Sequence, residues 1–130
     1  MTSKPFVAFV DDETELTEAY QELFEYKYQI KTFPSAEKYL AFVSEQKSNP
    51  FAVTVTDFKM ENLNGIEMIN QTFAQKLHCP FILLSGHVDH QLLKKLVSHG
   101  AEVILLEKPP DLKQLEQMIE KVLSGRKHSA

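Results

Sequence analysis

Apolar runs alternate with amphipathic stretches along the chain. The runs are rich in apolar and β-branched residues and occupy residues 5–10, 28–33, 51–56, 80–85 and 101–106. Four of them are almost continuously apolar, which is typical of parallel strands covered on both faces. The run at 28–33 is more polar and alternates, as an edge strand does.

Between these runs the apolar period lengthens from two residues to about 3.6, the period of a helix with one buried face. The clearest example contains Leu16, Ala19, Tyr20, Leu23 and Phe24. Similar spacing predicts four more helices, at about 36–43, 66–73, 92–97 and 112–122. Their expected start and stop signals are Asn64 with Glu67, Asp111 with Gln114, Gly100 and Gly125.

Strict alternation of strands and helices predicts an α/β fold, with one parallel sheet covered by helices on both faces. A chain of 130 residues is about one domain. We expect this domain to occupy residues 1–125, with residues 126–130 as a tail or the start of a linker. In such sheets ligands bind beyond the carboxyl ends of the strands.

Polar side chains follow four of the predicted strands. Asp11, Asp12 and Glu13 follow the first, Asp57 the third, Ser85 and Gly86 the fourth, and Glu107, Lys108 and Pro109 the fifth. Parallel strands bring these ends to one edge of the sheet. Clustered carboxylates repel one another unless a cation lies among them, and oxygen ligands suit Mg²⁺, with Mn²⁺ able to substitute.

A lysine ammonium and a serine hydroxyl beside such a cation are suited to hold phosphoryl oxygens. We therefore interpret Asp57 as a nucleophile that becomes an aspartyl phosphate, with Lys108 and Ser85 as its catalytic partners. The plainer interpretation is a solvated acidic rim with a nearby lysine. Four matching groups at four strand ends favour the phosphoryl site.

Composition limits the expected partners and cellular location of the chain. The net charge of −4 disfavours direct nucleic-acid binding, and no apolar run is long enough for a membrane span. The single cysteine, Cys79, excludes an internal disulfide and suits a small buried apolar residue in a reducing compartment. No signal-peptide pattern opens the chain, so a cytoplasmic location is expected.

The motifs resemble those of response-regulator receiver domains of two-component phosphorelay signalling, over about residues 5–125. The matching positions are Asp11, Asp12, Asp57, Met60, Gly65, Ser85, Gly86, Lys108 and Pro109. The resemblance implies a CheY-like, flavodoxin-like (βα)5 sheet of order 2-1-3-4-5. It also implies Mg²⁺ held by Asp12, Asp57 and the backbone carbonyl of Lys59, with Asp11 acting mostly through water, and a cis bond before Pro109.

The same resemblance implies a module that catalyses only its own phosphorylation and dephosphorylation. Its expected partners are a sensor histidine kinase or histidine phosphotransfer protein, and a downstream protein or an output domain outside this chain. Dimerisation through the last two helices, as a weak homodimer, is left open.

Several positions depart from the family pattern or vary within it. Glu61 replaces the usual proline after the acceptor, and Leu105 replaces the aromatic ring that normally relays phosphorylation to the output face. The fold should tolerate Glu61. Phosphorylation chemistry should survive Leu105, while signal readout is expected to be altered by it. Lys59 and His87 occupy the positions that tune how long the phosphoryl group lasts.

Three alternatives remain at this point. A haloacid-dehalogenase-type phosphatase shares the chemistry but needs an acid/base aspartate two residues after the nucleophile, where this chain has Lys59. A flavin-binding flavodoxin needs a phosphate loop after the first strand, where this chain has acids. A receiver that is not phosphorylated and acts only as a scaffold is disfavoured by the complete set of site residues.

Overall fold

The computed structural model describes residues 4–86 and 102–128, with side chains described to residue 125. The strands are β1 (Phe6–Val10), β2 (Gln29–Phe33), β3 (Val53–Asp57), β4 (Phe81–Ser85) and β5 (Val103–Glu107). The helices are α1 (Thr14–Phe24), α2 (Ala36–Ser44), α3 (Gly65–Ala74) and α5 (Leu112–His128). Strands and helices therefore alternate as the apolar pattern predicted.

All the strand pairs are parallel, and the sheet has the order β2-β1-β3-β4-β5. This confirms the α/β class and the expected 2-1-3-4-5 order. The polar run at 28–33 does form an edge strand, and the four apolar runs form the rest of the sheet. The strand order reverses between β1 and β3, the place where such sheets bind ligands.

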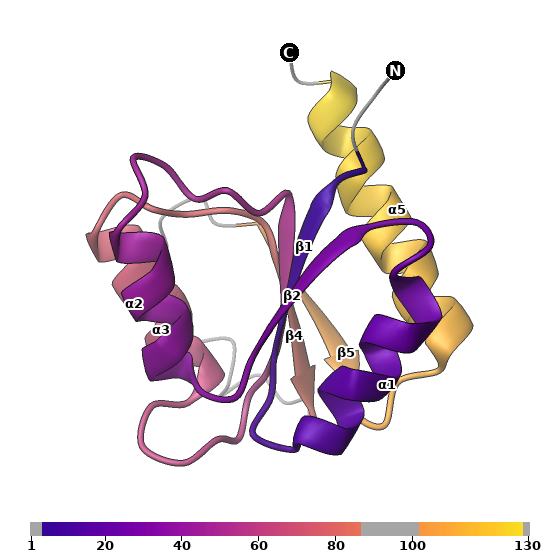
Figure 1. Ribbon diagram of the computed structural model, residues 1–130, viewed down its shortest axis with the longest axis horizontal. Coiled ribbons are helices and arrows are strands. Elements are labelled where there is room, and N and C mark those ends of the chain that lie inside the picture. The colour runs from indigo at the N-terminus through magenta and orange to yellow at the C-terminus, as the bar shows by residue number, and fades with distance from the viewer. Residues whose placement is uncertain (1–3, 87–101, 129–130) are drawn as a thin grey trace.

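Helices cover both faces of the sheet: α2 and α3 lie on one side and α1 and α5 on the other (Figure 1). Each face has its own hydrophobic cluster, one containing Phe33, Tyr39 and Phe81, and the other Phe9, Phe24 and Leu115. Successive strand residues point to opposite faces, so one apolar strand supplies both clusters. This explains why the central strands are continuously apolar.

The structure confirms one of the two predicted helix-start signals fully and the other in part. Asn64 and Glu67 form a complete capping box at the start of α3, with both hydrogen bonds at 2.9 Å. At the start of α5, the Asp111 side chain accepts a hydrogen bond from the backbone N–H of Lys113 at 2.8 Å. The first signal is confirmed, and the second helix does begin beside Asp111.

The predicted stop of the last helix at Gly125 is wrong, because α5 continues to His128. A glycine inside a helix costs only about 1 kcal/mol relative to alanine. Buried Leu115, Ile119 and Val122 anchor the helix on the sheet and outweigh that cost. The helix predicted around 92–97, with its stop at Gly100, lies outside the described residues, as does His87.

No helix within the described part of the chain is long and apolar enough to cross a membrane. Cys79 is buried, with 5% of its surface exposed, as predicted. The peptide bond before Pro109 is cis, as the family resemblance implied.

Candidate functional site

Strand register brings the two principal carboxylates together. Val10 of β1 pairs with Thr56 of β3, so the next residues, Asp11 and Asp57, stand side by side at the carboxyl edge of the sheet. Only 2% of Asp11 and 5% of Asp57 is exposed. Two carboxylates are therefore removed from most of their solvent, which is costly unless a cation compensates them.

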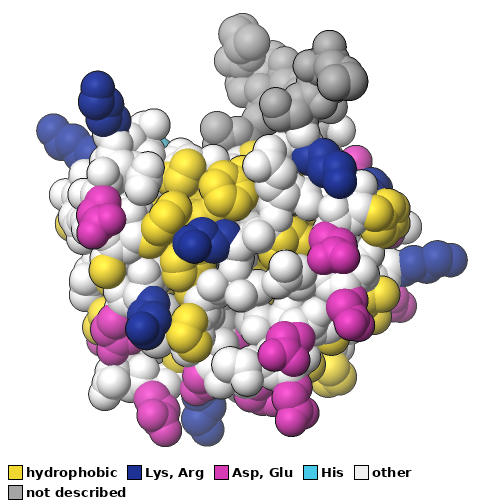
Figure 2. All heavy atoms as spheres, viewed as in Figure 1, with side chains coloured by type: hydrophobic (Ala, Val, Ile, Leu, Met, Phe, Trp, Pro, Cys, Tyr) yellow, Lys and Arg dark blue, Asp and Glu magenta, His cyan; other side chains and the backbone are white. Residues whose placement is uncertain are grey.

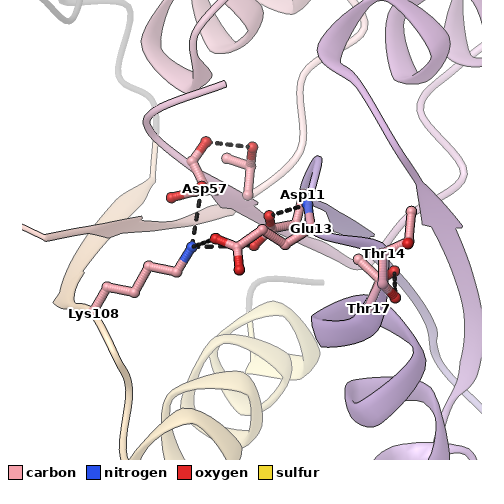
Figure 3. Close-up of polar contacts among 7 residues, drawn as sticks. Asp11, Glu13, Thr14, Thr17, Asp57 and Lys108 are labelled. Carbon is pink, nitrogen blue, oxygen red and sulfur yellow. Dashed lines mark hydrogen bonds and ion pairs between the residues drawn. The ribbon is translucent and has the colours of Figure 1, made fainter. Parts of the chain in front are cut away.

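Lys108 supplies one cation. It follows β5, and its backbone N–H donates to the carbonyl of Ser85 on β4 at 2.8 Å. Its side chain crosses the end of β4 and places Nζ 3.1 Å from Asp57 Oδ2 and 3.4 Å from Asp11 Oδ2 (Figure 3). One ammonium thus bridges both buried carboxylates.

Glu13 adds a third acidic contact, which the sequence interpretation did not include among the site residues. Its carboxylate lies 3.7 Å from Lys108 Nζ (Figure 3), but 65% of its side chain is exposed. Its backbone N–H donates to Asp11 Oδ1 at 2.9 Å. Glu13 precedes α1 as its N-cap, yet its side chain makes no capping hydrogen bond.

The three aspartates form a suitable cation site. One oxygen from each of Asp11, Asp12 and Asp57 lies within 4.8 Å of the others. Asp11 and Asp57 are buried while Asp12 is exposed. A hollow of about 310 Å³, lined by Asp12, Glu13, Thr14 and Glu15, opens beside Asp12. Solvent and ions can therefore approach the Asp12 carboxylate from the start of α1.

The described side chains at the site carry more negative charge than positive charge. Burial raises the pKa of Asp11, against the lowering effects of the Glu13 N–H and Lys108. Burial also raises the pKa of Asp57, where Lys108 lowers it and the charge of Asp11 raises it again. Burial lowers the pKa of Lys108, but its hydrogen bonds and charge interactions with Asp57 and Asp11 leave that pKa raised overall.

The positive charge of Lys108 therefore does not fully offset the burial of Asp11 and Asp57. The pKa of each carboxyl group remains raised above its ordinary value. A divalent cation bound by oxygen ligands would supply the missing positive charge. The donor set is hard and acidic, so the residues present fit Mg²⁺.

Gly65 fixes the loop that follows Asp57. Its backbone N–H donates to the carbonyl of Phe58 at 2.8 Å. A Cβ at this position would lie 2.6 Å from the carbonyl oxygen of Asp57 and 2.7 Å from Leu83 Cδ1. Only glycine lets α3 begin this close to the end of β3.

The remaining predicted residues lie around this group in different ways. Ser85 is buried at the end of β4, one strand from Asp57. Lys59 is exposed in the loop after Asp57, and Glu61 is exposed two residues further. Leu105 is partly buried on β5 and packs against the cluster that contains Tyr39.

The fold and the site together define a doubly wound α/β protein with a cluster of aspartates and one lysine where its strand order reverses. A model of the response regulator receiver domain matches residues 7–120. The chain therefore belongs to the family of response regulator receiver domains of two-component signalling.

Similar proteins agree with this assignment. The chain is 29% identical to the transcriptional regulatory protein FixJ of Bradyrhizobium diazoefficiens, over 95% of this chain and 58% of that protein. It is also 29% identical to the two-component response regulator ARR12 of Arabidopsis thaliana, over 92% of this chain and 20% of that protein. The chain therefore corresponds to only part of these relatives.

Solved structures match over almost the whole chain. A CheY-like receiver domain from Methanospirillum hungatei superposes with a TM-score of 0.85 at 19% identity, covering 98% of this chain and 100% of that one. The structure titled FixJ-N superposes with a TM-score of 0.76 at 27% identity, covering 95% and 96%. The first of these likenesses concerns the fold alone.

Proposed function

We propose that Asp57 is the residue on which this receiver domain accepts a phosphoryl group. The observation that carries the proposal is the contact between the buried Asp57 carboxylate and Lys108 Nζ, at 3.1 Å, inside a group of three aspartates. A structural ion pair would need one carboxylate for one lysine. The surplus of acids supports a site that takes up further cationic charge and then a phosphoryl group.

The donor is a phosphohistidine of a sensor histidine kinase or histidine phosphotransfer protein. An Asp57 carboxylate oxygen forms a bond to phosphorus while the bond from phosphorus to the imidazole nitrogen breaks, and the electron pair of that bond returns to the ring. Lys108 pairs with the incoming phosphoryl oxygens, and the Ser85 hydroxyl donates to one of them. The domain acts on itself alone, by gaining and losing this group.

Asp12, Asp57 and the backbone carbonyl of Lys59 would hold Mg²⁺, with Asp11 acting mostly through water. Mn²⁺ can replace Mg²⁺ in such an oxygen site. When bound, the cation neutralises charge on the phosphoryl oxygens. Lys59, whose side chain is exposed, and His87 modulate the lifetime of the acyl phosphate.

Phosphorylation switches a protein-binding surface, for a downstream protein or for an output domain beyond residues 1–125. Residues 126–130, of which 126–128 still belong to α5, lead into a tail or linker. The domain can form a weak homodimer, and it works in the cytoplasm. Leu105 alters the relay because it has no ring or hydroxyl to turn inward. A Leu105→Tyr variant that leaves every phosphorylation-dependent affinity unchanged would remove this role for Leu105.

Intact mass after incubation with acetyl phosphate or phosphoramidate tests the proposal. We expect the mass of one phosphoryl group to be added in the presence of Mg²⁺, and no addition with EDTA or in Asp57→Asn. Beryllofluoride binding separates the remaining cases if no adduct is seen. Binding would indicate rapid hydrolysis, whereas its absence would indicate a scaffold that is not phosphorylated.

A further inference from the structure

Tyr20 is a buried aromatic residue of α1 whose phenol interacts electrostatically with the charged groups of the acidic site. Only 4% of it is exposed, and its ring stacks on Phe9 of β1 with 5.0 Å between the ring centroids. Phe9 lies two residues before Asp11, which directly follows β1. The sequence assigned Tyr20 to the apolar face of its helix, which accounts for the ring and leaves the hydroxyl unexplained.

The direction of α1 places this hydroxyl near the site. Side chains on a helix lean toward its N-terminus, and α1 begins directly after the acidic residues that follow β1. Tyr20 is seven residues, or about two turns, after Glu13 and so lies on the same face. After burial itself, the charges of Asp11, Lys108, Asp57 and Glu13 act on the Tyr20 phenol, in that order of size.

The Tyr20 hydroxyl has no protein partner within residues 4–86 and 102–128. The other two buried tyrosines do have partners: Tyr28 donates to Glu120, and Tyr39 is hydrogen-bonded to Thr54. No fully buried polar side-chain atom of the described chain is left without a partner. The Tyr20 oxygen therefore keeps contact with solvent.

We propose that the Tyr20 hydroxyl is a positioning group that hydrogen-bonds to water in the hydration shell of the divalent cation held beside Asp11. Water on a divalent cation is a strengthened hydrogen-bond donor, and the neutral phenol oxygen accepts from it. The phenol proton remains available to water on the Asp11 side. Partners outside the ligand set orient and strengthen metal sites in this way.

This inference rests on the proposed Mg²⁺ site and is tested by the affinity of that site, with no phosphoryl donor present. Tyr20→Phe removes the hydroxyl and keeps the ring on Phe9. Isothermal titration with MgCl₂ should show about three- to tenfold weaker binding, the effect of one water-mediated hydrogen bond. Tyr26→Phe is the matched control, because Tyr26 is exposed and its hydroxyl lies 3.5 Å from Glu116 on α5, away from the site. Its affinity should stay within about twofold of wild type.

A second readout reports on the hydroxyl itself. The chain has four tyrosines and no tryptophan, so its near-ultraviolet absorbance is dominated by tyrosine. Mg²⁺ should produce a tyrosine difference spectrum in the wild type and in Tyr26→Phe, and this spectrum should be lost in Tyr20→Phe. Equal Mg²⁺ affinity and an unchanged spectrum in Tyr20→Phe would overturn the role of Tyr20 alone. A wild-type protein that binds no Mg²⁺ would overturn the metal site, and the inference with it.

Discussion

Strand β3 carries two buried polar clusters that differ in chemistry. Near its start, Thr54 belongs to a neutral cluster with Tyr39, Asn49 and Cys79. Thr54 and Asn49 each lie 2.9 Å from the Tyr39 hydroxyl, and Asn49 Nδ2 also donates to the carbonyl of Leu77 at 2.9 Å. At the other end of the strand, Asp57 belongs to a charged cluster with Asp11, Lys108 and Glu13.

The two clusters differ in how completely their polar and charged groups are paired within the protein. In the neutral cluster, donors and acceptors within the protein match one another, so the cluster holds α2 and the loop before β3 in place. In the charged cluster, burial leaves the pKa values of Asp11 and Asp57 raised, and the acids outnumber the lysine. Complete internal pairing indicates a structural role, whereas charge left uncompensated indicates a site for an external ligand.

The acidic character continues outward from the charged cluster. Figure 2 shows acidic side chains gathered over the side of the molecule that carries α1. Exposed Glu15, Glu18 and Glu22 belong to that helix. The negative potential of this surface draws cations toward the carboxylates. The neutral cluster, by contrast, consists of uncharged side chains.

The largest expected effect comes from removing the lysine. Lys108→Met leaves two buried carboxylates without their cation and removes a charge that pairs with the phosphoryl oxygens. We expect the rate of phosphorylation by phosphoramidate to fall by about 10²- to 10³-fold, the cost of losing one preorganised donor. The rate is measured by intact mass against time. Lys47→Met, at an exposed lysine in the loop after α2, is the control. Equal losses in both variants would contradict a special role for Lys108.

A somewhat smaller effect on stability is expected at Gly65. Gly65→Ala forces the new Cβ against the Asp57 carbonyl and Leu83, so the end of β3 must shift. We expect the free energy of unfolding to fall by about 1–3 kcal/mol, together with slower phosphorylation. Urea unfolding measures the first quantity. Gly125→Ala, where a Cβ would meet nothing within 4 Å, should instead be neutral or slightly stabilising.

The neutral cluster should respond in stability alone. Tyr39→Phe removes one hydrogen-bond partner from Thr54 and one from Asn49, which keep their contacts with Cys79 and Leu77. We expect the loss to cost about 0.5–1.5 kcal/mol of unfolding free energy. Phosphorylation should keep its wild-type rate once the protein is folded. A variant as stable as wild type, or one that folds normally but is phosphorylated slowly, would contradict a purely structural role for the neutral cluster.

The smallest effect has the opposite sign. Without divalent cation at neutral pH, Asp57→Asn should raise the free energy of unfolding by an amount on the order of 1 kcal/mol, because it removes a buried charge from an acidic group. The folded state holds the Asp57 proton more tightly than the unfolded state does. Stability due to this group is therefore present at low pH and is lost as pH rises from the ordinary carboxyl pKa through the raised one.

The gain in Asp57→Asn should accordingly be small in acid and grow with pH across that window. Urea unfolding of both proteins at a series of pH values measures it. Adding Mg²⁺ should reduce the difference, since only the wild type keeps the full set of three aspartates. A gain that is the same at every pH would show that the Asp57 charge is not its cause.

Much of the fold could be predicted because its signals are local. Alternating apolar periods located every described strand and helix, and the capping box located the start of α3. Asp11, Asp12, Asp57, Ser85 and Lys108 could be proposed as site residues because parallel strands bring their carboxyl ends to one edge. The proximity of the three aspartates and the contacts of Lys108 agree with that reasoning.

Other features depend on packing that a sequence does not show. The helix passes Gly125 because residues a turn or more earlier hold it on the sheet. Tyr20 looked like an ordinary apolar-face residue, since the direction of its hydroxyl depends on how α1 lies over β1. Glu13 could be recognised as one of the acids after the first strand, but its contact with Lys108 joins residues far apart in the chain.

The central claim is that Asp57 receives the phosphoryl group, and borohydride trapping tests it most directly. Borohydride reduces an aspartyl phosphate to homoserine, so the acceptor is marked permanently and can be located by peptide mass spectrometry. After phosphorylation with Mg²⁺ present, we expect homoserine at position 57 and at no other aspartate. Homoserine at Asp11 or Asp12, or a phosphorylated protein that yields none, would contradict the account.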